Sequence, residues 1–253
     1  PACDVVVVTL KTTQNHLLRS ILPTLLKPDG VVLVLQNGLG IEAEIANLVG
    51  DDRVLGGVCF ICTTRFGPGY IRHFYYDLIT LADYRTGYAS AGLSQRMHRI
   101  AADLEGAGFL VHLAEDLLLA RWQKLVCDLP FSALSVVLNA TIRQIMANPY
   151  AQHLVEQIMQ EVIAVAASQG CKIAEDYIQK RLISVAKIGM YRTCMKVDYD
   201  EKRSMELEAI IGNPLRIAQQ VGVNTPQIAM LYQQLKYLDV CNQLRGTRFA
   251  LAS

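Results

Sequence analysis

The chain has 253 residues, enough for one large domain or two of ordinary size, and its 52% hydrophobic and 19% charged residues are a globular composition. A net charge of +1 without a run of Lys or Arg gives no electrostatic footprint for nucleic acid, so we expect no nucleic-acid partner. The apolar segments are short or interrupted by Gly, Pro and charged residues, so we expect no membrane-spanning segment.

The first half of the sequence alternates between strand and helix patterns. Val5 to Thr9 is a β-branched run of the kind found in a buried parallel strand. Strands are predicted at 5–9, 31–35, 54–63 and 109–113, and helices at 14–26, 41–48 and 93–104. The runs 70–76 and 78–82 follow Gly67-Pro-Gly69 and are predicted to form a hairpin or an antiparallel edge. This order predicts a doubly wound, Rossmann-like α/β sheet.

After Asp116 the pattern becomes helical, without a flexible linker. Helices are predicted at 116–127, 131–147, 150–168, 175–187, 201–220 and 226–239. The sequence therefore predicts a partial dinucleotide-binding domain over 1–115 and an all-α substrate and dimerisation domain over 116–253. Apolar residues on more than one helix face, such as Leu154, Ile158 and Ile163, lead us to expect a homodimer.

A dinucleotide-binding sheet carries a Gly-x-Gly-x-x-Gly sequence after its first strand. No such sequence occurs here, so we expect an N-terminally incomplete sheet that lacks roughly one βαβ unit. These 253 residues alone are then expected to bind NADP(H) weakly. Gln36-Asn-Gly-Leu-Gly40 is a weak phosphate-loop signal, and a tight strand-to-helix turn explains it better.

Seven cysteines, an odd number, lie mostly in apolar surroundings, which fits reduced thiols in a cytoplasmic protein. Cys59 and Cys62 have Cys-x-x-Cys spacing, but no second pair follows at zinc-finger spacing. A strand would also point them to opposite faces. We expect no metal site.

Lys124 is the residue that most suggests chemistry. Leu117, Trp122, Leu125 and Leu129 form a buried helical stripe, and Lys124 lies near its edge at the junction between the two halves. A lysine that loses water and meets a carbonyl oxygen can act as a general acid. The alternative is an ion pair on a solvated edge with Asp128, four residues later.

Several segments together resemble the ketopantoate reductase family, the 2-dehydropantoate 2-reductases. The segments are Thr9-Leu-Lys11-Thr-Thr-Gln14, Leu35-Gln-Asn37-Gly38-Leu-Gly40, Gly56-Gly-Val58, Gly67 to His73, Trp122-Gln-Lys124-Leu125 and Met195 to Gly212. Their order and spacing hold along nearly the whole chain. The resemblance implies an NAD(P)-dependent oxidoreductase of pantothenate biosynthesis that reduces a small 2-keto acid to the 2-hydroxy acid, with NADPH favoured over NADH.

The resemblance also implies roles for individual residues. Lys124 corresponds to the general acid, and Glu206 to the glutamate that holds the lysine or a substrate hydroxyl. Four residues are implied to bind the cofactor: Lys11, Gln14, Asn37 and Gly38. The implied substrate-binding positions are Asn37, Asp128, Ser132 and Cys194.

Three of these positions depart from the family pattern. Asp128 and Ser132 stand where the family usually has asparagines, and Cys194 stands where it has a serine. An aspartate should repel a keto-acid carboxylate unless Lys124 or another cation offsets it. Two alternatives therefore stay open: a related β-hydroxyacid-type dehydrogenase with another substrate, and a non-catalytic helical dimerisation or ligand-binding relative.

Overall fold

The structure is a computed structural model that describes residues 2–189 and 191–250. The chain divides into two compact units, Pro1–Lys124 and Leu125–Ser253. The sequence predicted the boundary between residues 115 and 116. In the structure the boundary lies after Lys124, because the first two turns of the long helix α4 belong to the first unit.

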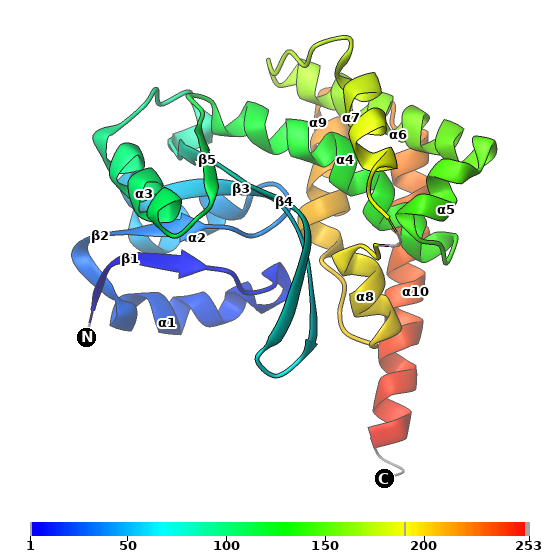
Figure 1. Cartoon of the computed structure of the whole chain (residues 1–253), viewed down its shortest axis with the longest axis horizontal. Helices are drawn as coiled ribbons and strands as arrows, with labels where there is room; N and C mark the ends of the chain where they lie inside the picture. Colours follow the sequence, from blue (N-terminus) through cyan, green and yellow to red (C-terminus); the bar gives the residue numbers. More distant parts are fainter. Residues whose placement is uncertain (1, 190, 251–253) are drawn as a thin grey trace. The chain divides into compact units, whose positions relative to one another are not determined.

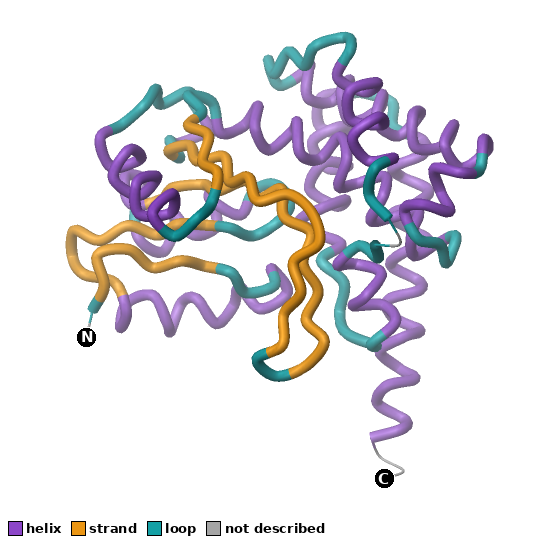
Figure 2. Tube along the Cα trace, viewed as in Figure 1, coloured by secondary structure: helices purple, strands orange, loops and turns teal. Residues whose placement is uncertain are grey.

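The first unit contains a five-stranded sheet (Figures 1 and 2). Its strands are β1 (Cys3–Val8), β2 (Leu26–Val34), β3 (Val54–Gly67), β4 (Tyr70–Asp83) and β5 (Leu110–Leu113), which lie side by side in that order. β1, β2 and β3 are parallel, β4 is antiparallel to β3, and β5 is parallel to β4. The β-branched runs that predicted strands form β2, inside this mixed sheet, and β1, at its edge. β1 is therefore only partly buried, and the expectation of a buried strand there is wrong.

Helices cover both faces of this sheet. They are α1 (Leu18–Leu25), α2 (Ile41–Val49) and α3 (Gln95–Gly106), with short 3-10 turns at Thr12–Leu17, Asp51–Arg53 and Thr86–Tyr88. Met97 and Ile100 of α3 pack on one face, against Leu55 and its neighbours. Gly56 follows Leu55 in β3 and therefore faces the other side of the sheet. A Cβ at this position would contact Glu42 of α2. The predicted Rossmann-like, doubly wound α/β class is confirmed.

The antiparallel part of the sheet differs from both expectations for 70–82: these residues form no hairpin, and the antiparallel strand they form is not at the edge, because β5 pairs with it. Residues 70–83 form one strand, β4, which pairs with β3 across the turn at Pro68-Gly69. The sequence break after Tyr76 is a bulge, because Ile61 pairs with Asp77 and Cys62 with Tyr75. Tyr76 has a φ of 57° and is the extra residue, so the strand bends there without reversing.

The described residues of the second unit form helices and the loops that connect them, without a strand. Its helices are α4 (Leu117–Val137, shared with the first unit), α5 (Ile142–Ala147), α6 (Pro149–Ser168), α7 (Tyr177–Ala186), α8 (Cys194–Asp200), α9 (Asn213–Val221) and α10 (Pro226–Ala250). A π-helical turn at Glu208–Gly212 precedes α9. Within residues 2–189 and 191–250, every helix is either too short or too polar to span a bilayer.

Three predicted helices have different bounds in the structure. The predicted break between 127 and 131 is wrong: α4 continues through Pro130 and ends at Val137, shortly before Asn139, whose φ of 50° lies outside the helical region. Thr141 then starts α5 with a capping box to Gln144. The predicted helix at 201–220 is wrong in its first part, because α8 ends at Asp200 and Lys202 has a φ of 57°.

Most of the apolar side chains of α6 are covered within the chain itself. Ile158 is buried, as are Val155, Met159, Val162, Val165 and Ala166, so these side chains belong to the core of the helical unit. Leu154 and Ile163, which had also suggested a surface for a second copy, are only partly buried.

Candidate active site

Lys124 has a buried ammonium at the edge of the sheet where β2 ends. Only 6% of the residue is exposed. Its Nζ donates to Oδ1 of Asn37 at 2.5 Å and to the carbonyl oxygen of Cys59 at 2.6 Å, and it lies 5.8 Å from the ring centre of Phe60. This placement does not fit the alternative of a lysine on a solvated helix edge. A desolvated, oriented ammonium is the arrangement that proton donation to a carbonyl requires.

The loop from Gln36 to Gly40 presents Asn37 to this ammonium. β2 ends at Val34 and α2 begins at Ile41. Gly38 and Gly40 have φ values of 104° and 87°, which residues with a side chain adopt only with strain. The glycines therefore allow the tight strand-to-helix turn that the sequence suggested, and Asn37 lies at its start, half-buried.

Lys11 and Gln14 follow the neighbouring strand, β1. The N–H of Leu35 donates to the carbonyl of Val8, so the carboxyl ends of β1 and β2 lie side by side. Lys11 is half-buried, and Gln14 is exposed in the 3-10 turn that follows it. Gln36 joins the two loops through hydrogen bonds from Nε2 to the Leu10 carbonyl (2.6 Å) and Asn15 Oδ1 (2.7 Å).

Sequence reasoning missed a buried ion pair one helical turn before Lys124. Arg121 and Glu42 are 1% and 0% exposed. Nε of Arg121 donates to Oε1 of Glu42 at 2.8 Å, and Nη2 contacts the same oxygen. Leu117, Arg121 and Lys124 are spaced i, i+4, i+7 on one helix face. An arginine on a face that is otherwise buried could have indicated a carboxylate partner.

Three of the four predicted substrate-binding residues lie in the second unit. Asp128 and Ser132 are on α4, and Cys194 is on α8. Asp128 is half-buried, and Ser132 is buried with its carbonyl accepting from Ser135 Oγ at 3.0 Å. Ser135 also contacts Thr193 Oγ1 at 2.7 Å. Cys194, which begins α8, is exposed, and its Sγ lies 3.9 Å from the Tyr191 hydroxyl.

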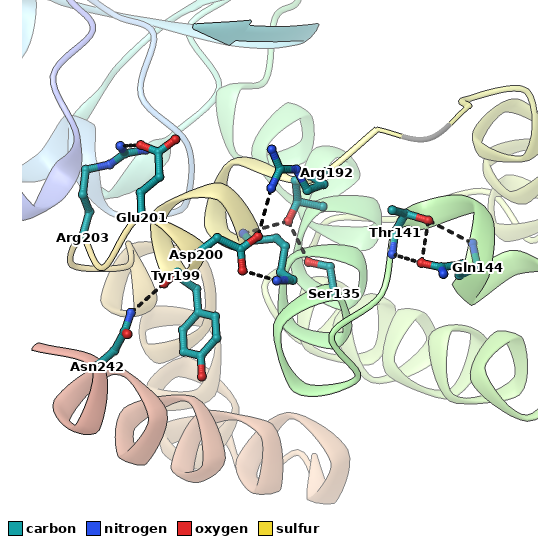
Figure 3. A network of polar contacts seen from close by, with 11 residues as sticks. Ser135, Thr141, Gln144, Arg192, Tyr199, Asp200, Glu201, Arg203 and Asn242 are labelled. Atoms are coloured by element: carbon teal, nitrogen blue, oxygen red, sulfur yellow. Dashed lines mark hydrogen bonds and ion pairs between the residues drawn. The ribbon is translucent and has the colours of Figure 1, made fainter. Parts of the chain in front are cut away.

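Glu206 lies in the segment between α8 and the π-helical turn and is 6% exposed. The N–H of Met205, its neighbour, donates to Oδ1 of Asp239 on α10 at 3.1 Å. Figure 3 shows the contacts that hold the preceding residues, including Asn242 Nδ2 donating to the Tyr199 carbonyl at 2.7 Å. Side-chain contacts from α10 thus fix the backbone before Glu206.

Glu208, two residues later, has a different environment. It is exposed and accepts hydrogen bonds from Arg216, Tyr232 and Lys236. Partial burial opposes its ionisation, but these hydrogen bonds outweigh that effect and lower the pKa of Glu208. The structure thus separates a buried Glu206 from an exposed, ion-paired Glu208.

The structure therefore groups the predicted site residues by unit. The sheet unit brings Lys124 and Asn37 into contact, with Lys11 and Gln14 after the adjacent strand. The helical unit contains Asp128, Ser132, Cys194 and Glu206. The pairing of Lys124 with Glu206 joins residues of different units and stays a prediction. No group of three or more His, Cys, Asp or Glu side chains among the described residues is arranged to hold a metal ion.

Comparison with known proteins agrees along most of the chain. The family model "Ketopantoate reductase PanE/ApbA" matches residues 1–86, and "Ketopantoate reductase PanE/ApbA C terminal" matches residues 116–239. A 2-dehydropantoate 2-reductase of Nostoc sp. is 54% identical over 243 residues, covering 96% of this chain and 76% of the relative.

Two solved structures of 2-dehydropantoate 2-reductases are also similar. The protein from Geobacter metallireducens has a TM-score of 0.89 at 34% identity, covering 93% of this chain and 77% of that one. The protein from Methylococcus capsulatus has a TM-score of 0.83 at 32% identity, covering 96% and 76%. The resemblance seen in the sequence is confirmed: the chain belongs to the ketopantoate reductase family, a family of oxidoreductases.

Proposed function

We propose that the protein reduces a small 2-keto acid to the 2-hydroxy acid, with 2-dehydropantoate as the leading substrate and Lys124 as the proton donor. The observation that carries this proposal is the buried Lys124 ammonium, held by Asn37 Oδ1 and the Cys59 carbonyl where β2 ends. Ligands of open α/β sheets bind at the carboxyl ends of the strands. The relative that is 54% identical is named for this reaction.

The chemistry assigns one step to the lysine. A 2-keto acid becomes a 2-hydroxy acid when its carbonyl carbon gains a hydride and its oxygen gains a proton. The Lys124 ammonium first polarises the carbonyl oxygen and then gives it a proton, which leaves a neutral amine that is reprotonated from water. Asn37 and the Cys59 carbonyl orient the ammonium before substrate arrives.

The hydride would come from NADPH, with NADH as the less favoured donor. Lys11, Gln14, Asn37 and Gly38 are proposed to hold this cofactor. The residues fit such a group, because two parallel strands end side by side and glycines without a Cβ form the tight turn of the next loop. Oε1 of Gln36, buried at the same edge, accepts no hydrogen bond from the described residues.

Glu206 and three residues of the helical unit complete the proposal. Glu206 is proposed as the partner of Lys124 or of a substrate hydroxyl, and Asp128, Ser132 and Cys194 as substrate-binding residues. Asp128 is half-buried, so an anionic side chain at this position affects which acid binds. A related 2-keto acid is therefore the second candidate substrate.

We also propose that the protein is a cytoplasmic homodimer. Seven cysteines, an odd number, suit a reducing compartment. Met230, Tyr237, Val240 and Leu244 on α10 are exposed apolar residues that a second copy could cover. Sedimentation that shows only monomer at micromolar concentration would contradict the dimer.

The test is the oxidation of NADPH and NADH by the full-length protein with a panel of 2-keto acids, including 2-dehydropantoate. Lys124→Ala should lower turnover by roughly 10²–10⁴-fold, because the oxygen loses its proton source and its charge partner. Lys180→Ala is the control, since that lysine is exposed and ion-paired with Asp176, and it should keep parent turnover. Near-normal turnover in Lys124→Ala, or no oxidation by the parent protein with any 2-keto acid, would overturn the proposal.

A further inference from the structure

A buried ion pair and its hydrogen-bond partners join α4, α2 and Tyr88 to the end of β2, directly before Asn37. The Arg121 cluster consists of the side chains of Arg121 (α4), Glu42 (α2) and Tyr88, with the carbonyl groups of Val34 and Gln36 at the end of β2. Nη1 of Arg121 donates to the Gln36 carbonyl at 2.7 Å, and Nη2 approaches the Val34 carbonyl at 3.4 Å. The Tyr88 hydroxyl donates to Oε2 of Glu42 at 2.8 Å.

The Arg121 cluster lies next to Asn37 and Lys124 in the chain. Gln36, whose carbonyl Arg121 binds, directly precedes Asn37. Lys124 lies three residues after Arg121 on the same helix, so its side chain projects from the same face. Arg121 thus binds the backbone at position 36 while Lys124 binds the side chain at position 37.

We propose that Arg121, held by Glu42, is a positioning residue that sets the distance between the Lys124 ammonium and Asn37. This inference rests on the proposed function. Glu42 lies in the first turn of the helix that follows the Gln36–Gly40 loop, so the cluster fixes both ends of that loop relative to α4. Displacing a catalytic group by about 1 Å can cost 10²-fold in rate, so this fixation has kinetic consequences.

The geometry requires arginine in particular. Three guanidinium nitrogens bind one carboxylate oxygen and two carbonyl oxygens. A lysine would keep the positive charge but has a single nitrogen on a flexible stem, so it cannot hold these oxygens in fixed directions. Arg121→Lys therefore keeps the positive charge at this position and removes the fixed hydrogen-bond geometry, so it tests the geometry alone.

The experiment is a double-mutant cycle between Arg121→Lys and Asn37→Ala, measured as kcat and KM for the best 2-keto acid. Arg121→Lys should lower kcat by roughly 10–100-fold with a smaller change in KM, because a misplaced proton donor affects the transition state more than binding. In the Asn37→Ala background the same change should cost less than about threefold, because the contact that Arg121 positions is already lost. A role in overall stability alone would give the same loss in both backgrounds.

Arg96→Lys is the matched control. Arg96 also joins a carboxylate, Asp83, to backbone carbonyls, but at the amino end of β3, and turnover should stay within about twofold of the parent. Trp122, the single tryptophan, is fully buried beside Arg121, and its emission reports whether each variant is folded. Should Arg121→Lys not fold, Tyr88→Phe gives the same test through Glu42, with a roughly threefold to tenfold loss of kcat that disappears in Asn37→Ala.

The two proposals fail in different ways. Near-normal turnover in Lys124→Ala overturns the proposed function. A folded Arg121→Lys protein with parent kcat, an equal loss in both Asn37 backgrounds, or an equal loss in Arg96→Lys overturns the positioning role while Lys124→Ala stays inactive.

Discussion

Two arginines of the sheet unit form similar contacts on opposite faces of the sheet, but in different environments. Arg121 binds Glu42 and the carbonyls at the carboxyl end of β2, and both side chains are almost fully buried. Arg96 binds Asp83 and the Val54 carbonyl at the amino end of β3, and 25% of its side chain is exposed. Only the Arg121 cluster adjoins Lys124 and Asn37.

The difference in burial between the two ion pairs distinguishes an ion pair that contributes only to stability from one that also positions residues of the candidate site. Burying a charge costs free energy that the ion pair and hydrogen bonds must offset, and the cost is greater where less water remains. At the Arg96 cluster, water can hydrate an arginine that loses its carboxylate. At the Arg121 cluster it cannot, so the structure there tolerates less change, beside residues that need fixed positions.

The largest expected effect is on stability when each carboxylate is removed. Glu42→Ala leaves a fully buried guanidinium and should lower the free energy of unfolding by about 3–5 kcal/mol. Asp83→Ala leaves a guanidinium that solvent reaches, and should cost about 1–2 kcal/mol. Urea unfolding followed by Trp122 emission measures both, and equal losses would remove the distinction between the two clusters.

A methyl group placed on each face of β3 should sharpen the comparison. A Cβ at Gly56 would lie 2.4 Å from Leu117 and 2.8 Å from Oε1 of Glu42, whereas one at Gly57 would lie 2.3 Å from the end of the Leu35 side chain. Each change should cost about 1–3 kcal/mol through overpacking. Only Gly56→Ala displaces the carboxylate that binds Arg121, so it alone should lower kcat, by roughly tenfold. Equal kcat values for the two folded variants would contradict this expectation.

The smallest expected effect is on the pH dependence of stability, because only the Arg121 cluster contains a phenol. Burial raises the pKa of Tyr88 well above its ordinary value, and the charge of Glu42 raises it further. A raised pKa means that the stability from the bound proton is complete below about pH 10 and is lost as pH rises above it. The loss is at most about 1.4 kcal/mol per pH unit for one proton.

Tyr88→Phe should therefore show a shallower decline in the free energy of unfolding above about pH 10 than the parent. The two proteins differ only at position 88, so the difference between their slopes reports on that side chain. Urea unfolding at increasing pH gives the two slopes, and parallel slopes would mean that Tyr88 is not held protonated by the cluster.

Much of the fold follows from local sequence patterns. The valine runs predicted β1 and β2, and apolar residues at helical spacing predicted α2, α3 and α6. The bends were harder, because they depend on pairing between distant residues. The bulge at Tyr76 exists only through its register with Ile61 and Cys62. The continuation of α4 through Pro130 likewise depends on tertiary packing around buried neighbours.

The residues of the candidate site that lie in family motifs were predictable from the sequence, and the residues outside these motifs were not. Lys124 and Asn37 were singled out from the sequence, and the structure places them in contact. Arg121 and Glu42 are 79 residues apart, and neither has a local pattern that names the other. A buried charge has a partner for electrostatic reasons, but the identity of that partner is set by the fold.

The long β3–β4 ribbon has a consequence for local opening of the protein. β2 pairs with β3 only over 54–56 and β5 pairs with β4 only over 78–81, so beyond the bulge the two strands pair only with each other. Phe66, Tyr70 and Ile71 at the end of this ribbon are exposed. An isolated two-stranded ribbon is marginally stable in water. Its amides should therefore exchange with solvent through a local fluctuation that leaves residues 54–58 protected, and the ribbon is the part of the sheet that a protease would cleave first.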